Sequence, residues 1–232
     1  MKILLAKLIL FFLLVIPFSV FSQSNTKTAY FEKDSITQKG FTLVYINKSE
    51  SFDPAVGQKL KDTFFRVYPP MVKQYNKKSA RKVTFLIDPA YDGVAATSSD
   101  RVIYNPDWFR RNPNDIDVVT HEVMHIVQAY SRTPGPWWVT EGIADYVRYK
   151  YGVANAEGNW TLPDVNKNQN YDNSYRVTAR FFAWIVKNKN KKFIEKMDQA
   201  MRDHSYNDEL WVELTGGTPA SLWKEYLANP AI

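Results

Sequence analysis

The sequence predicts an α+β fold, with a small twisted sheet in the N-terminal part and a mostly helical C-terminal half. Residues 41–46 and 82–87 cluster or alternate β-branched and aromatic side chains, which favours strands. After residue 137 the apolar residues recur at helical spacing instead. Strands in one part of the chain and helices in another are typical of α+β proteins.

The elements between these strands and the C-terminal helices follow in order. Residues 54–75 have the pattern of a helix, which we expect to be disturbed at Pro69-Pro70 because proline has no N–H group and clashes with the preceding turn. Residues 93–100 and 101–104 predict a hairpin, or an edge strand with its return strand. The stretch 154–174 is rich in Asn and Asp and predicts a long irregular loop, a candidate lid or specificity element.

A helix with two histidines four residues apart follows the hairpin. Polar and acidic residues at 112–115 favour a helix start near there. One apolar stripe then runs along the helix, formed by Ile116, Val119, Val123, Ile126, Val127 and Tyr130. His121 and His125 point away from that stripe. Because positions i and i+4 lie one above the other on a helix, both imidazoles can reach one metal ion.

The pattern H-E-x-x-H at residues 121–125 predicts a zinc site, with Glu122 placed to contact a metal-bound water. The alternative is an amphipathic core helix with two ordinary histidines. That alternative fits poorly, since two of the three histidines in the chain flank a glutamate here. We therefore expect one Zn²⁺ per chain, held in part by His121 and His125.

The third ligand of a catalytic zinc site has to come from elsewhere in the chain. The residues after His125 lack the H-x-x-G-x-x-H continuation, which excludes the metzincin pattern. After a break at residues 134–136, residues 138–151 predict a second helix. Glu141 and Asp145 share one face of it. Glu141 is the natural third ligand, and Asp145 can accept the free N–H of a ligand histidine.

The ligand set His, His, Glu with a following E-x-x-x-D resembles that of the gluzincin peptidases. Longer segments resemble the basic secretory protein family, peptidases of plants and bacteria, over roughly residues 40–226. They are HEVMHIVQ at 121–128, PWWVTEGIADYVRYK at 136–150, SYRVTARFFAWIV at 174–186 and the closing segment 201–226. The resemblance implies a zincin-like fold and a secreted, zinc-dependent protein of the endopeptidase type.

The ligands also indicate a mechanism. Zinc lowers the pKa of its bound water to about 7, and Glu122 takes the proton as general base before passing it to the leaving amine. The oxyanion needs one further donor, which in gluzincins is a Tyr or His downstream of the third ligand. We expect Tyr175 in this role because it matches the family motif, with Tyr171 and His204 as the alternatives. Tyr175 could equally anchor the start of a helix.

The segment 93–100 suggests how a peptide or protein substrate would bind. Its small and β-branched residues predict an edge strand along the cleft, to which an extended substrate adds as a further strand. An unpaired strand edge can hold an extended substrate through main-chain hydrogen bonds, which do not require a particular substrate sequence. The expected substrate-binding residues are Val94, Ala95, Ala96 and Thr97. An ordinary edge strand or a surface hairpin is the alternative.

The first 22 residues predict a signal peptide, with Lys2 and Lys7 ahead of the apolar run 8–16 and the small residue Ser22 before Gln23. The run is too short to span a bilayer comfortably, so a membrane anchor is the weaker alternative. Residues 23–232 would then form a single domain, exported to the periplasm or the extracellular space. Loss of two lysines would lower the formal net charge from +6 to +4.

Composition narrows the function classes further. The chain has no cysteine, which excludes disulfides and a thiol nucleophile. The mild basic excess carries no nucleic-acid signature, and we expect a monomer without a nucleic-acid partner. A non-catalytic extracellular binding protein that keeps the scaffold is the alternative to a peptidase. The intact Glu122 favours the peptidase, because a structural zinc site has no use for a general base.

Overall fold

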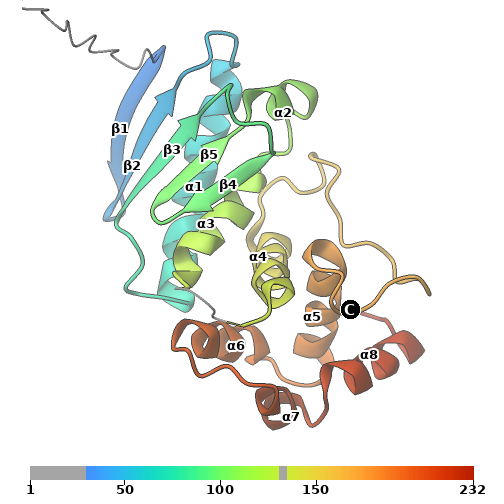
Figure 1. Cartoon of the computed structure of the whole chain (residues 1–232). Helices are drawn as coiled ribbons and strands as arrows, with labels where there is room; N and C mark the ends of the chain where they lie inside the picture. Colours follow the sequence, from blue (N-terminus) through green and yellow to red (C-terminus); the bar gives the residue numbers. More distant parts are fainter. Residues whose placement is uncertain (1–29, 131–134) are drawn as a thin grey trace, which may run out of the picture.

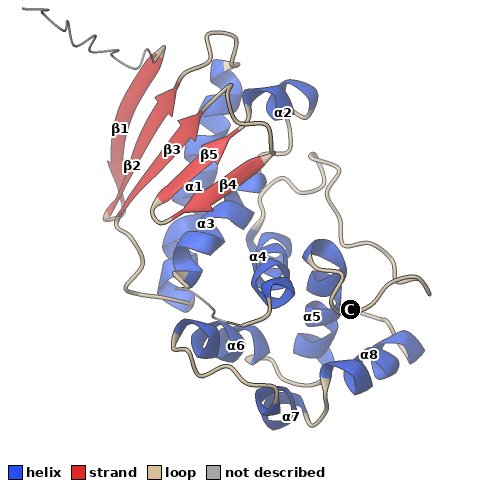
Figure 2. Cartoon of the chain, in the orientation of Figure 1, coloured by secondary structure: helices blue, strands red, loops and turns tan. Residues whose placement is uncertain are grey.

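The computed structural model describes residues 30–130 and 135–232, and the predicted signal peptide at residues 1–22 lies outside them. Within the described residues the chain forms one five-stranded sheet and eight helices. Figure 2 shows the strands gathered on one side of the molecule and the C-terminal helices on the other. The α+β class predicted from the sequence is thus confirmed.

The sheet has mixed strand directions and the order β1-β2-β3-β5-β4. β2, β3 and β5 run parallel, while β1 and β4 pair antiparallel with them at the two edges. The strand predictions at 41–46, 82–87 and 93–104 are confirmed, and β4 lies at the edge that faces the helical half (Figure 1). The strands are β1 (Glu32–Gln38), β2 (Phe41–Asn47), β3 (Lys82–Ile87), β4 (Ala95–Ser98) and β5 (Arg101–Tyr104).

β1 was not predicted because it has no apolar face. Its sequence, EKDSITQ, is mostly charged or polar, and all of its residues are exposed or half-buried. An edge strand pairs on one side only and here covers little of the core. Hydrophobic periodicity, which reveals strands that bury one face, therefore gives no signal for it.

Helix α1 (Pro54–Gln74) lies behind the sheet and continues through the two prolines that were expected to disturb it. Because Pro69 has no N–H group, the carbonyl of Phe65 loses its partner within the helix. The Lys39 ammonium, from the turn between β1 and β2, donates to that carbonyl at 3.4 Å. The helix is therefore unbroken, with one lost hydrogen bond replaced from outside.

The segment between β5 and the histidine helix corrects the prediction of a helix start near 112–115. A separate short helix, α2 (Pro106–Arg111), comes first, and residues 112–117 form turns. The histidine helix, α3 (Val118–Gln128), begins only after them. Asp115, the acid that suggested the start, is held by side chains of α2 and of a later helix. Asp115 therefore joins separate elements through its side chain and does not cap the helix, as its place in the sequence had suggested.

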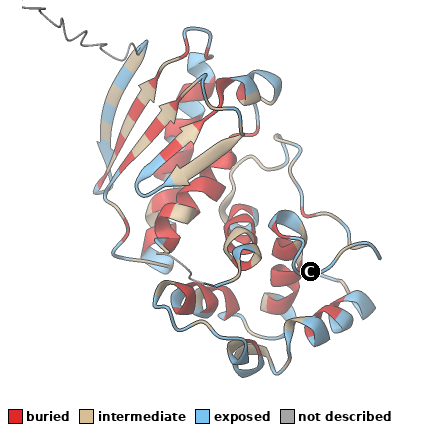
Figure 3. Cartoon of the chain, in the orientation of Figure 1, coloured by how far each residue is buried: buried red, intermediate tan, exposed pale blue. Residues whose placement is uncertain are grey.

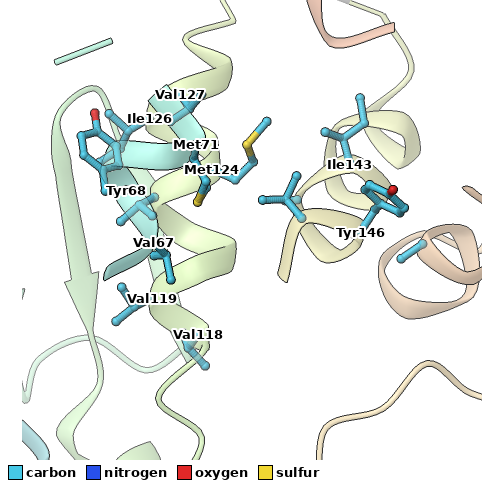
Figure 4. Close-up of a cluster of buried hydrophobic side chains, with 14 of the residues drawn as sticks. Val67, Tyr68, Met71, Val118, Val119, Met124, Ile126, Val127, Ile143 and Tyr146 are labelled. Atoms are coloured by element: carbon cyan, nitrogen blue, oxygen red, sulfur yellow. The ribbon is translucent and has the colours of Figure 1, made fainter. Parts of the chain in front are cut away.

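α3 lies between α1 on one side and α4 (Trp137–Tyr151) on the other. All residues of α3 except His125 are buried (Figure 3). The predicted apolar stripe from Ile116 to Val127 is confirmed, and the opposite face with the histidines is enclosed as well. Helix faces packed on both sides leave side chains little freedom. Figure 4 labels the side chains that fill the two interfaces: Val67, Tyr68 and Met71 from α1, Val118, Val119, Met124, Ile126 and Val127 from α3, and Ile143 and Tyr146 from α4.

The remainder of the chain is helical, as predicted. α4 is followed by α5 (Tyr175–Asn188), α6 (Phe193–Arg202), α7 (Glu209–Thr215) and α8 (Pro219–Ala228). Residues 152–174, between α4 and α5, contain turns but no helix or strand, which confirms the irregular loop. Within the described part of the chain, no helix has the length and apolarity needed to cross a bilayer.

Replacing Pro70 by alanine should stabilise the protein. Alanine restores an N–H that can donate to the Arg66 carbonyl, and it removes the clash of the proline ring with the preceding turn. After subtracting the entropy returned to the unfolded chain, we expect the free energy of unfolding to rise by about 1–2 kcal/mol in urea denaturation. Pro54→Ala is the matched control, because Pro54 occupies the first turn of the same helix and should give no gain. Equal or lower stability of Pro70→Ala would contradict this account.

Candidate metal centre

Three side chains from α3 and α4 converge at one point. The Nε2 atoms of His121 and His125 lie 3.1 Å apart. Both face Oε2 of Glu141, at 3.3 Å from the His121 nitrogen and 3.5 Å from the His125 nitrogen. One ligand atom from each residue lies within 4.8 Å of the other two, so a single metal ion could contact all three. The structure therefore brings together the three residues that the sequence predicted as ligands.

The other ring nitrogen of each histidine is held by an acceptor. His121 Nδ1 lies 2.7 Å from Oδ1 of Asp145, and His125 Nδ1 lies 2.7 Å from Oε1 of Gln128. The Gln128 amide is oriented in turn, because its Nε2 group donates to the Thr140 carbonyl at 2.9 Å. Since both neighbours accept, each Nδ1 carries the hydrogen and each Nε2 presents its lone pair to the shared point.

This donor set fits a divalent cation. Two nitrogen lone pairs that face each other at 3.1 Å repel unless a proton or a cation lies between them. Burial alone would lower the pKa of His121, but the surrounding carboxylates, Asp145 first, outweigh burial and raise that pKa to about 10. Burial would also raise the pKa of Glu141, but the two imidazoles beside its carboxylate, which donate to it when they are protonated, hold that pKa well below its usual range. The place where these three side chains converge thus favours a positive charge. Two imidazoles and one carboxylate are also a known ligand set of catalytic zinc.

Glu122, between the two histidines in sequence, is positioned by the sheet. The Thr97 hydroxyl of β4 donates to Oε2 of Glu122 at 2.7 Å and also lies 3.0 Å from the Glu122 carbonyl oxygen. Glu122 lines the same cleft as the two histidines. Thr97 was expected to bind substrate, and the structure directs its side chain to Glu122 instead of leaving it free.

Tyr175 is the predicted oxyanion donor that the structure brings closest to the ligands. Its ring stacks on His121, with centroids 6.1 Å apart, and its other neighbour is the ring of Trp137, which is 63% exposed. Ser174 and Tyr175 both have positive φ, 66° and 46°, a strained conformation that tends to occur at functional sites. Burial, with Glu141 nearby, raises the pKa of the Tyr175 hydroxyl, which therefore remains a donor at neutral pH.

The two alternatives to Tyr175 lie away from the ligands. Tyr171 packs against Trp138, with ring centroids 5.3 Å apart, and neither Tyr171 nor His204 lines the cleft. His204 follows the end of α6 and is exposed. Of the three candidates, only Tyr175 reaches the cleft that contains the ligands.

β4 leaves one row of backbone groups unpaired at the edge of the sheet. The Asn105 N–H donates to the Val94 carbonyl at 3.1 Å, which fixes the alternation along the antiparallel pair. The backbone groups of Val94 and Ala96 therefore face β5. The backbone groups of Ala95 and Thr97 face away from β5, at the unpaired edge of the sheet.

The ligands, Glu122 and β4 line one cleft of about 1480 Å³. It follows α3 from Val118, at the start of the helix, to Tyr130, just beyond its end, with the ligands between them. Val94, Ala95, Ala96 and Thr97 all line it. The Tyr91 hydroxyl donates to the Ala95 carbonyl at 3.1 Å, so the Ala95 N–H and the backbone groups of Thr97 remain for a ligand.

Two contacts at this centre were not predicted from the sequence. Gln128 received no role, although it lies three residues after His125 and hence on the same side of the helix. That spacing could have identified it. The contact of Thr97 with Glu122 joins a strand to a helix across the fold, and no local pattern reveals such a pair.

Solved structures with a similar fold include a zinc metallopeptidase and an aminopeptidase N family protein. One is an M1 zinc metallopeptidase mutant from Deinococcus radiodurans bound to a Tyr-Ser-Ala substrate, with 11% identity and a TM-score of 0.51 over 87% of this chain and 53% of that one. Another is an aminopeptidase N family protein from Idiomarina loihiensis, with 10% identity and a TM-score of 0.52 over 84% of this chain and 46% of that one. This chain thus spans about half the length of either structure, and at such low identity the likeness establishes the fold alone.

No curated protein matches the sequence significantly. A family model does match, over residues 39–226, and that family is described as peptidase of plants and bacteria. The matched range includes α3, α4 and α5, and with them all three converging ligands. It also agrees with the resemblance inferred from the sequence motifs. The chain therefore belongs to this family of peptidases of plants and bacteria.

Proposed function

We propose that this protein is an exported zinc-dependent peptidase that hydrolyses bonds within peptide or protein chains. The observation that carries the proposal is the convergence of two imidazole Nε2 atoms and Glu141 Oε2 in the same cleft as the Glu122 carboxylate. Membership in a family of peptidases supports a peptide substrate. Residues 1–22 would be removed on export, and residues 23–232 would act as a single, monomeric domain.

The three converging residues would hold one zinc ion, and Asp145 and Gln128 would orient the two imidazoles. Zinc, when bound, supplies a Lewis acid that lowers the pKa of a coordinated water and polarises the substrate carbonyl. Glu122 would accept the proton of the attacking water and carry it to the leaving amine. Thr97, by donating to Glu122 Oε2, would keep that carboxylate in one orientation.

Tyr175 would donate its hydroxyl to the oxyanion that forms at the substrate carbonyl. Its position against His121 supports this role, as does the strained backbone at Ser174 and Tyr175. The side chain is 50% exposed, which leaves it room to adjust when a peptide enters. A donor of this kind stabilises the transition state more than the bound substrate.

The substrate would lie along β4 as an added strand. The outward-facing Ala95 N–H and the backbone groups of Thr97 would bind its main chain, and Val94 and Ala96 would contribute only side-chain surface. The cleft continues past the ligands toward both ends of α3. A peptide can therefore extend in both directions from the bond that is cleaved, which favours an endopeptidase over an exopeptidase.

A non-catalytic binding protein on the same scaffold is the alternative function. The position of Glu122 argues against it, because a carboxylate held by Thr97 beside the ligands would be suited to proton transfer and would add nothing to metal retention. Zinc content measured together with cleavage of an unstructured protein distinguishes the two. Bound zinc without cleavage would support the alternative.

The protein should bind one zinc ion per chain. Metal analysis of protein purified without a polyhistidine tag should give a ratio close to one, and His125→Ala should abolish binding. Asp145→Asn and Gln128→Leu should weaken zinc affinity on the order of 10–100-fold, because each removes an acceptor that orients an imidazole. His204→Ala is the control and should retain full zinc. A wild-type protein that takes up no zinc would refute the assignment.

Glu122→Gln should retain zinc and lose hydrolysis. The amide keeps the shape of the side chain but cannot act as a base, so kcat should fall by about 10²–10⁴-fold while zinc content stays the same. Glu213→Gln is the matched control, because Glu213 is exposed and does not line the cleft, and it should leave both quantities unchanged. Undiminished cleavage by Glu122→Gln would rule out this mechanism.

Proline substitutions in β4 should separate substrate binding from folding. Ala95→Pro removes an outward-facing donor, so KM for long peptides should rise about 3- to 10-fold with little change in melting temperature. Ala96→Pro removes a donor that faces β5 and should lower the melting temperature instead. Steady-state kinetics on long and minimal peptides, with thermal unfolding of both variants, test this. Unchanged KM for long peptides in Ala95→Pro would argue against strand addition.

A further inference from the structure

The cleft extends beyond the ligands toward the start of α3, where two tryptophans line it. Trp108 comes from α2 and Trp160 from the loop after α4, and both are half-buried. Val118 of α3, Arg148 of α4 and Gly158 line the same end. We call this end of the cleft the tryptophan pocket, defined by Trp108, Val118, Arg148, Gly158 and Trp160.

The polar groups of the tryptophan pocket are engaged with one another. The Arg148 guanidinium forms an ion pair with Asp115, and the two side chains are only 6% and 10% exposed. Asp115 Oδ2 also accepts from Trp108 Nε1 at 3.0 Å. The guanidinium lies over the Trp160 ring, 4.6 Å from its centroid. The charges cancel and the Trp108 indole donor is used, so the surface that these residues leave for a ligand is mainly aromatic and aliphatic.

The loop that carries Trp160 is fixed at its start. Asp117 accepts from the N–H groups of Val153 and Ala154 at 2.9 and 2.6 Å. Asn155 bonds Arg148 twice, through its Nδ2 to the carbonyl at 2.9 Å and from the guanidinium Nε at 3.1 Å. The loop is thus tied to the start of α3 and the end of α4.

Gly158 brings the same loop against the turn before α3. A Cβ atom there would lie 3.0 Å from the Asn114 carbonyl oxygen and 3.1 Å from the Asp115 Cα, both backbone atoms. Any larger residue would therefore force the loop or the turn to shift by a few tenths of an ångström. With the bonds described above, this close approach makes residues 153–160 a rigid wall of the cleft and not a lid.

The tryptophan pocket lies next to the ligands. Val118 precedes His121 by three residues on α3, and Arg148 follows Asp145, the acceptor that binds His121, by three residues on α4. Three residues of helix rise by about 4.5 Å. Successive residues of an extended peptide are about 3.3 Å apart. The pocket is therefore within one or two substrate residues of the bond at the metal centre.

We propose that the tryptophan pocket binds a large apolar side chain, preferably an aromatic one, from a substrate residue within two positions of the scissile bond. This inference rests on the proposed peptidase function and adds the chemical class of residue selected. A charged side chain is disfavoured because its charge would enter a site whose own ion pair is already neutral and buried. Two half-buried indoles supply the area that makes aromatic binding favourable.

Binding to an inactive protein tests the pocket separately from catalysis. Zinc-loaded Glu122→Gln protein is titrated calorimetrically with a series of eight-residue peptides of Ala, Gly and Ser that differ at one central position, occupied by Phe, Leu, Ala, Asp or Lys. The Phe and Leu peptides should bind about 10- to 100-fold more tightly than the Ala peptide, and the Asp and Lys peptides no better than Ala. Equal affinity across the series, or no measurable binding of the Phe peptide, would overturn the proposal.

Variants then assign the preference to the pocket. Adding Trp160→Ala to the inactive protein should remove most of the preference for Phe, whereas Trp160→Phe should retain it. Tyr149→Ala removes an aromatic ring that is 45% exposed outside the cleft and should leave the preference intact. Zinc content and circular dichroism check that each variant is folded. A preference that survives Trp160→Ala in a folded, zinc-loaded protein contradicts the assignment.

Cleavage by the wild-type protein separates this proposal from the proposed function. Cut sites in an unstructured protein should have a large apolar residue at one fixed position within two residues of the cut. Cleavage without that preference would refute the pocket and leave the peptidase intact. Selective binding by the inactive protein, with no cleavage by the wild type, would support the pocket and refute the peptidase.

Discussion

The centre depends on how α3 and α4 are held against each other by buried polar contacts. Along the shared face, Asp145 of α4 binds His121 of α3, and Gln128 of α3 binds the Thr140 carbonyl of α4. Burying any of these polar groups without its partner would cost free energy. All of them are paired only when α3 and α4 are aligned as they are here. A shift of either helix by one residue would break both bonds. The imidazole positions are thus set by the helix packing that also forms the core.

The alignment of α3 with α4 also positions side chains other than the three ligands. Arg148, three residues past Asp145 on α4, reaches Asp115 just before α3 and closes the far end of the interface. The loop after α4 is then tied back to the same turn through Asp117. On the other side, Thr97 of β4 contacts Glu122, which couples the sheet edge to α3. α4, β4 and the loop after α4 are therefore all positioned in the cleft by their contacts with α3, which is buried on both faces.

Local patterns predicted the parts of this site that lie on one helix face. Spacing along a single helix identified two pairs from the sequence: His121 with His125, and Glu141 with Asp145 on the next helix. Contacts between separate elements that no motif marks, such as the one between Thr97 and Glu122, were not visible in the sequence. The helix start was misplaced because Asp115 serves a distant arginine, and β1 was missed because an exposed edge strand has no apolar period.

Charge is distributed in this molecule so that one cleft offers two kinds of binding site. The chain as a whole is cationic, with a formal net charge of +6, yet its centre places the carboxylates of Glu122, Glu141 and Asp145 around two imidazoles. That local excess of negative charge favours a cation. One turn away, Arg148 and Asp115 cancel each other. Under the proposed function, a peptide that crosses the cleft would meet a metal-binding point for its carbonyl beside a neutral, aromatic surface for its side chain. Because one buried α3–α4 interface positions both surfaces, we expect a change that moves the helices to alter the proposed metal binding and the proposed substrate preference together.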